Sequence, residues 1–145
     1  MILSNQQLFS DAQAVTSTAI SENVIDLGLP GTPYRAQGPL RQDIGKGTKV
    51  PVLIQVVEDF AGATSVTIAI ECAENANLTG DKNVVHSEQI AVADLVAGKQ
   101  TFVQVLPTGL DKRYLGLRYT VAGTATAGAI TAGITMGVQT NKDSA

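Results

Sequence analysis

The sequence predicts an all-β fold: a single jelly-roll-like β-sandwich of about eight strands, formed by residues 1–145 as one domain. Three observations predict it. Apolar side chains recur at every second residue in several segments. Gly, Pro, Asn and Asp separate these segments at short intervals, and a sustained 3.6-residue helical period is absent. Eight short strands with regular turns fit a sandwich or barrel, of which the jelly roll is an eight-strand form.

Eight segments have strand character. The clearest is residues 65–72, where alternate residues from Val66 to Cys72 are apolar and the opposite face holds Ser65 and Glu71, which predicts one buried and one solvated face. Residues 50–57 are apolar on both faces, so we expect this strand to be covered on both sides. The full set comprises residues 14–20, 23–27, 50–57, 65–72, 84–92, 101–106, 113–121 and 130–138. Turns are expected at residues 60–62, 79–81, 107–109 and 122–124.

The last of these segments has an unusual second face. Between its apolar residues it holds only small ones: Thr131, Gly133, Thr135 and Gly137. Such positions allow another backbone or a neighbouring subunit to approach closely. No charged side chain occurs between Tyr119 and Asn141 to protect this region from pairing. We therefore expect self-association, as a dimer or alternatively as a trimer.

Helical signals are weak. Residues 94–98 resemble one helical turn, with Asp94 near the start and Gly98 at the end. The N-terminal segment, residues 1–13, has two equally supported interpretations. Residues 4–13 either form a short helix capped by Ser4, with Leu3 and Leu8 as a hydrophobic staple, or belong to an extended arm.

Residues 28–48 form a long Gly/Pro loop that does not fit a compact sandwich. The segment contains Pro30, Pro33 and Pro39 together with Gly28, Gly31, Gly38, Gly45 and Gly47. A structureless loop of about twenty residues in a small domain is usually functional or disordered. Four of the ten basic residues lie in it or next to it: Arg35, Arg41, Lys46 and Lys49. The loop either reaches a partner or is a solvated segment whose charges serve solubility alone.

Composition argues against several functions. The formal charge of −3 provides no basic excess for binding nucleic acid. A single His86 and a single Cys72 are too few for a zinc site or a catalytic triad, and Cys72 lies on an apolar strand face, where its pKa is raised. Gly45 to Thr48 lacks the spacing of a phosphate-binding loop. We therefore expect no enzymatic activity and no cofactor.

Carboxylates occur near the ends of two predicted strands. Glu58 and Asp59 precede one turn, and Glu71 and Glu74 flank the end of the next strand. A sugar hydrolase needs paired carboxylates, usually in a groove with aromatic platforms, and this chain has no Trp. We interpret these side chains as solvated carboxylates at the rim of the sandwich.

The sequence shows no secretion or membrane signal. No basic residue precedes the first apolar residues, and the least polar stretch, residues 127–138, is too short for a membrane helix. We expect a protein that does not bind membranes and is made in a reducing cytoplasm.

Several blocks occur in an order and spacing that resembles one known family. They are residues 8–15 and 23–28, the Glu58-Asp59-Phe60 turn, Leu106-Pro107, residues 113–119 and residues 128–133. Together they resemble the capsid cement (decoration) proteins of tailed bacteriophages, of the type found on a Bordetella podophage, over nearly the whole chain. The resemblance implies a jelly roll on the exterior of the virion capsid, which bridges copies of the major capsid protein and has no catalytic activity.

Two segments are expected to bind the partner. Residues 1–13 and 28–48 have too little periodic apolar content to fold on themselves, so a partner must offset their ordering entropy. The residues predicted to contact it are Leu8, Phe9, Arg35 and Arg41, with the arginines as charged anchors. Deleting residues 1–10 is expected to leave the domain folded. The alternative function is a carbohydrate-binding or tail-associated β-sandwich module.

Overall fold

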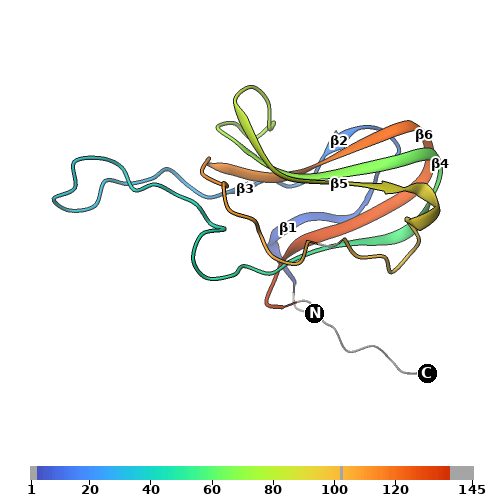
Figure 1. Ribbon diagram of the computed structural model, residues 1–145, viewed down its shortest axis with the longest axis horizontal. Helices are drawn as coiled ribbons and strands as arrows, with labels where there is room; N and C mark the ends of the chain where they lie inside the picture. Colours follow the sequence, from blue (N-terminus) through green and yellow to red (C-terminus); the bar gives the residue numbers. More distant parts are fainter. Residues whose placement is uncertain (1–2, 102, 138–145) are drawn as a thin grey trace.

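The computed structural model describes residues 3–101 and 103–137, and it is all-β, as predicted (Figure 1). The elements are β1 (Leu3–Ala14), β2 (Ala19–Ile20), β3 (Ile25–Asp26), β4 (Val52–Ala73), β5 (Lys82–Ala91), the 3-10 helix η1 (Val92–Asp94) and β6 (Tyr114–Thr135). The described strands form one antiparallel sheet in the order β1-β6-β4-β5, with β2 and β3 also paired to β6.

Two long strands dominate this sheet. β4 and β6 each have 22 residues, and they pair from Val52↔Ile134 at one end to Ala73↔Tyr114 at the other. Midway along the pair the register shifts four times, and the ribbon bends there so that its two halves lie in two facing layers (Figure 1). A single sheet folded over on itself therefore provides both layers.

The bend replaces two predicted turns. Gly62 and Gly123 lie in it with φ of +85° and +95°, a conformation that side chains disfavour. The chain changes direction at both positions while it stays paired in the sheet, so the predicted breaks at residues 60–62 and 122–124 are wrong. As a result, segments 50–57 and 65–72 merge into β4, which starts at Val52, and segments 113–121 and 130–138 merge into β6, which ends at Thr135; Val138 lies outside the described residues.

Phe60 fills the inside of the bend. Its side chain is buried, and its backbone N–H donates to the carbonyl of Leu95 at 3.0 Å. Gly128 lies directly against the ring, because a Cβ at this position would be 2.4 Å from Phe60 Cδ1. The sheet can close around an aromatic ring here because residue 128 has no side chain.

The remaining strands extend the two layers. β5 pairs with the second half of β4, β1 with the second half of β6, and β2 and β3 with its first half. Residues 101–106 were predicted as a strand, but residues 101 and 103–106 instead follow β4 through irregular hydrogen bonds such as Val52 N–H to the Gln104 carbonyl at 3.0 Å; Phe102 lies outside the described residues. The described residues thus contain six strands instead of about eight. The helical turn expected at residues 94–98 is only partly correct: η1 lies earlier and ends at Asp94, and a separate turn follows in which Lys99 N–H donates to the Val96 carbonyl at 3.0 Å.

The core lies between the two layers. It receives side chains from both halves of β4 and β6, and its largest fully buried members include Tyr119, Ile68, Ile70, Leu117 and Ile130. Cys72 belongs to it, and burial raises the pKa of its thiol, which confirms the sequence interpretation.

The N-terminal segment is part of the sheet. Residues 3–14 form β1 and pair with β6 from Leu3↔Thr135 to Ala14↔Ala129, so within the described residues neither a helix nor a free arm is correct. The Phe9 side chain is fully buried in the core, and Leu8 is buried against Gly133. These two residues stabilise the fold and present no surface to a partner. Deleting residues 1–10 would remove the buried Phe9 from the core, so we expect this variant to be strongly destabilised instead of staying folded.

Of the small-residue face, Gly133 and Thr135 are buried and Thr131 is partly exposed, whereas Gly137 lies beyond the end of β6 and is exposed. β6 lies between β1 and β4, and Gly133 is paired with Leu8 on one side and Leu53 on the other. The Thr131 hydroxyl accepts a hydrogen bond from Ala12 N–H at 2.9 Å, and Thr135 is buried. The chain itself therefore covers part of the surface on which we based self-association. Self-association itself stays a prediction.

A buried polar chain joins β1 to β6. The Tyr119 hydroxyl lies 2.8 Å from Ser10 Oγ, which donates to Gln13 Oε1 at 2.6 Å, and Gln13 Nε2 donates to the Ile20 carbonyl. Burial raises the pKa of Tyr119, so its hydroxyl stays neutral. These hydrogen bonds connect β1 to β6 through Tyr119 and to β2 through Ile20.

Changing Tyr119→Phe is expected to lower the free energy of unfolding by about 1 kcal/mol, because Ser10 loses a buried hydrogen-bond partner. Urea denaturation measures this change. Tyr34→Phe is the control, since Tyr34 is 88% exposed, and it should leave stability within about 0.5 kcal/mol of the unchanged protein. Equal urea midpoints for the unchanged protein and both variants would show that the hydrogen bonds of Tyr119, Ser10 and Gln13 do not contribute to stability.

Candidate functional site

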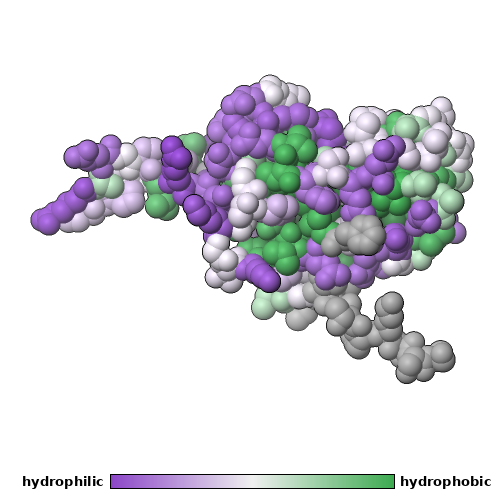
Figure 2. Space-filling view, viewed as in Figure 1, coloured by the Kyte–Doolittle hydropathy of each residue, from purple (hydrophilic) through white to green (hydrophobic). Residues whose placement is uncertain are grey.

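One loop projects far from the folded body. Residues 27–49 contain no helix or strand, and residues 29–41 are exposed at every position. We call residues 29–41 the projecting loop; it extends to the left in Figure 1 and stands clear of the body in Figure 2. Two hydrogen bonds shape it, from Ala36 N–H to the Pro33 carbonyl and from Leu40 N–H to the Gly31 carbonyl, both at 2.9 Å.

The projecting loop exposes both apolar and cationic side chains. Leu29, Tyr34 and Leu40 are 75%, 88% and 59% exposed. Arg35 and Arg41, predicted as anchors, are both exposed. The Arg35 guanidinium lies 5.2 Å from the centroid of the Tyr34 ring, within cation–π range. Arg35 also has φ of 64°, a left-handed conformation that is uncommon for a residue with a side chain.

The base of this loop is fixed to the body. Both Asp43 carboxylate oxygens accept from Gly109 N–H at 3.1 Å, and Ile44 packs against the core. Gly45 lies against the chain at Pro107, because a Cβ at Gly45 would be 1.8 Å from the Pro107 carbonyl oxygen. The contacts of residues 43–45 therefore anchor one end of the projecting loop.

An ion pair fixes the other end. Arg113 donates from Nε and Nη2 to the two Asp26 carboxylate oxygens, both at 2.7 Å, and Gly28 N–H donates to the same carboxylate at 2.8 Å. The Arg113 hydrogen bonds, followed by that of Gly28, lower the pKa of Asp26 to about 2. Because Arg113 immediately precedes β6 and Asp26 ends β3, this pair holds the start of the loop against the sheet.

A hollow of about 570 Å³ lies between the projecting loop and the body. Its lining comes from the loop, the base and the ends of neighbouring connections: Leu29, Pro30, Pro39, Leu40, Arg41, Gln42, Asp43, Lys46, Glu74, Asp111 and Arg113. Sequence reasoning did not find it, because Glu74 and Asp111 are distant from the loop along the chain.

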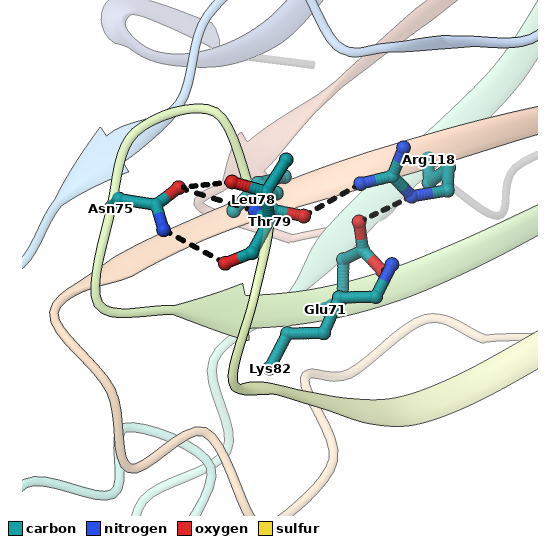
Figure 3. A network of polar contacts seen from close by, with 6 residues as sticks. All are labelled: Glu71, Asn75, Leu78, Thr79, Lys82 and Arg118. Carbon is teal, nitrogen blue, oxygen red and sulfur yellow. Dashed lines mark hydrogen bonds and ion pairs between the residues drawn. The ribbon is translucent and has the colours of Figure 1, made fainter.

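A second loop, residues 74–81, lies over the outer face of the sheet (Figure 3). Glu71 is fully buried beneath it, and its carboxylate accepts from Arg118 Nε at 2.7 Å and from Lys82 Nζ at 2.8 Å. Arg118 Nη2 also donates to the Leu78 carbonyl at 2.7 Å. Leu78 is buried with φ of 50°, and Gly116 leaves the space for its side chain. The network of Glu71, Arg118 and Lys82 therefore fixes residues 74–81 against the sheet. Glu74, the first residue of this loop, lines the hollow.

The prediction that Glu71 is a solvated rim carboxylate is wrong. Alternation correctly placed Glu71 on the outer face of its strand, but residues 74–81 cover that face and two basic residues compensate the charge. Glu58, Asp59 and Glu74 are exposed, as expected. Lys82 and Arg118 are 11 and 47 residues away, so no local pattern indicated the pairing.

His86 and the acidic side chains are the other candidates for chemistry. His86 is partly exposed, and its Nε2 lies 3.8 Å from Glu88 Oε2. Across residues 3–101 and 103–137, no group of three or more His, Cys, Asp or Glu side chains could hold a metal ion. No helix in that part of the chain is both long and apolar enough to span a membrane.

The fold and the loops together define a small all-β protein with a basic, partly apolar loop displayed at one end. Residues 9–134 match the model of the Bbp16 family, and the chain belongs to that family. The family's name points to a protein of a Bordetella phage. No curated protein matches this chain.

Replacing Glu71 by Gln is expected to lower the free energy of unfolding by about 1–3 kcal/mol, since Arg118 and Lys82 lose a buried carboxylate but keep partial access to water. Chemical denaturation measures the loss. Glu74→Gln, at an exposed position, is the matched control and should change stability by less than about 0.5 kcal/mol. A Glu71→Gln protein as stable as the control would show that the network does not hold the loop.

Proposed function

We propose that this protein is a virion structural protein that binds the outside of a phage head and stabilises it by bridging subunits of the major capsid protein. The observation that carries the proposal is the projecting loop, whose thirteen residues are all exposed on a base fixed at both ends. Membership of the Bbp16 family supports a phage protein. The resemblance to capsid cement proteins suggests the major capsid protein as the partner.

The projecting loop has the chemistry of a protein-binding element. Tyr and Arg are enriched among the residues that dominate binding energy at interfaces, and Tyr34 and Arg35 lie together at its turn. Leu29 and Leu40 leave apolar surface in water that a partner would cover. The left-handed backbone of Arg35 has a free-energy cost, and such strain concentrates at binding and active sites.

Charge favours an acidic partner surface. The chain has ten basic and 13 acidic residues, and the projecting loop holds two of the basic and none of the acidic ones. The rest of the protein therefore carries eight basic against 13 acidic residues. Carboxylates on the head would attract the loop and repel the remainder of the surface, which would orient docking by this end. Arginine can also bind a carboxylate through two hydrogen bonds.

Head stabilisation follows from repetition of a modest contact. Many copies of one small interface, each joining neighbouring subunits, add up to a large effect on the shell. In this proposal the protein acts on the capsid exterior as a jelly-roll-like module without catalytic activity or cofactor, after synthesis in the host cytoplasm. The alternative carbohydrate-binding or tail-associated module gains no support from the hollow, because none of its described lining residues is aromatic.

Changing both Arg35 and Arg41 to Ala is expected to weaken binding to heads by about tenfold or more, because charged hydrogen bonds contribute about 1.5–3 kcal/mol each. Co-sedimentation with purified heads that lack the protein measures the affinity. Lys49→Ala is the control: Lys49 is exposed and basic but lies outside the projecting loop. Both variants should have unchanged urea midpoints.

Three results would contradict the proposal. One is the absence of binding between the unchanged protein and heads. A second is undiminished binding of the double variant. The third is binding to host polysaccharide in place of heads, which would favour the carbohydrate-binding alternative.

A further inference from the structure

We infer that the hollow beneath the projecting loop receives an extended segment of the partner polypeptide, with an apolar side chain flanked by one acidic and one basic residue. The inference rests on the proposed function and names the part of the partner that this end of the molecule takes. The lining of the hollow combines apolar side chains with charged side chains of both signs, and each kind restricts what can occupy it.

One part of the lining is apolar. Leu29, Pro30, Pro39 and Leu40 come from the two stems of the projecting loop, which the Leu40 to Gly31 hydrogen bond holds together. Both leucines are more than half exposed. Two prolines restrict the backbone of these stems, so little conformational entropy remains to be lost when this part of the lining is covered. An apolar side chain entering the hollow would remove both leucines from water.

The charged groups divide into occupied and available ones. Asp43 accepts from Gly109 N–H, Asp111 from Asn83 Nδ2, and Arg113 is paired with Asp26. Among the described residues, the side chains of Arg41, Lys46 and Glu74 have no hydrogen bond or ion pair. The pKa of Arg113 and that of Lys112 are raised mainly by their hydrogen bonds to Asp26 and Asp81, and the nearby Glu74 charge contributes to both. The hollow therefore offers two cations and one carboxylate in the same lining as the leucines.

This charge pattern favours a polypeptide. A polyanion such as nucleic acid would meet the carboxylates of Asp43, Glu74 and Asp111 in the same space. A sugar would find no aromatic ring among the described lining residues to stack on. A peptide segment can carry both signs of charge beside an apolar side chain, and about 570 Å³ lies within the range of ligand pockets. The acidic residue would face Arg41 and Lys46, and the basic residue Glu74.

Site-specific photocrosslinking on heads tests this inference. The photoreactive residue p-benzoylphenylalanine is introduced separately at position 40 in the hollow, at position 34 at the turn, and at exposed position 120 on β6 as the control. Irradiation of head-bound protein is expected to join positions 34 and 40 to the major capsid protein. The peptide captured at position 40 should contain an apolar residue with acidic and basic neighbours, and position 120 should give no adduct.

The outcomes separate the inference from the proposed function. Capture at position 34 with none at position 40, or capture at position 40 of a second copy of this protein or of a segment lacking both charges, overturns the inference and leaves the proposed function standing. Failure of the unchanged protein to bind heads overturns both.

A charge reversal gives an independent readout. Glu74→Lys is expected to weaken binding to heads about tenfold, and Glu58→Lys, exposed at the bend, is not. Equal binding of these two variants also overturns the inference.

Discussion

The pairing of β4 with β6 is the constraint on which the rest of the structure depends. The two strands stay paired over their full length, and the bend at Phe60 and Gly128 brings the two halves of the ribbon face to face. Every other described strand pairs with one half of this ribbon. The position of both loops depends on this pairing too. Arg118 lies in β6 and Glu71 in β4, and their ion pair holds loop 74–81. Arg113, which immediately precedes β6, binds Asp26 at the start of the projecting loop.

Much of the fold could be predicted from local pattern, because alternation of apolar residues directly reports which strand face is buried. Residues 65–72 and 52–57 lie in β4 with the expected core residues. Continuity through the bend could not be predicted, since Gly62 and Gly123 are compatible both with a turn that ends a strand and with a bulge inside one. The N-terminal segment was misjudged because the burial of Phe9 depends on contacts far along the chain.

The candidate site was predictable only in part. Proline and glycine density identified the segment that projects, and the two arginines within it are exposed as expected. The full lining of the hollow was not predictable, because Glu74 and Asp111 are distant from the projecting loop in the sequence. Glu74 belongs to loop 74–81, and only the folded sheet brings these two residues to the hollow. That loop in turn depends on the buried pairing of Glu71 with Arg118. The sequence pattern thus locates exposed segments, whereas the arrangement of charges around them is a property of the folded sheet.

The central claim is that the loop end of the molecule is the surface that attaches. Hydrogen–deuterium exchange, compared between the free and head-bound protein, tests it most directly. The account predicts that added protection on heads is concentrated in residues 28–48 and 74–81, with little change in β5 and in the bend. Protection centred on β5 or on the bend, with the projecting loop unchanged, would contradict it.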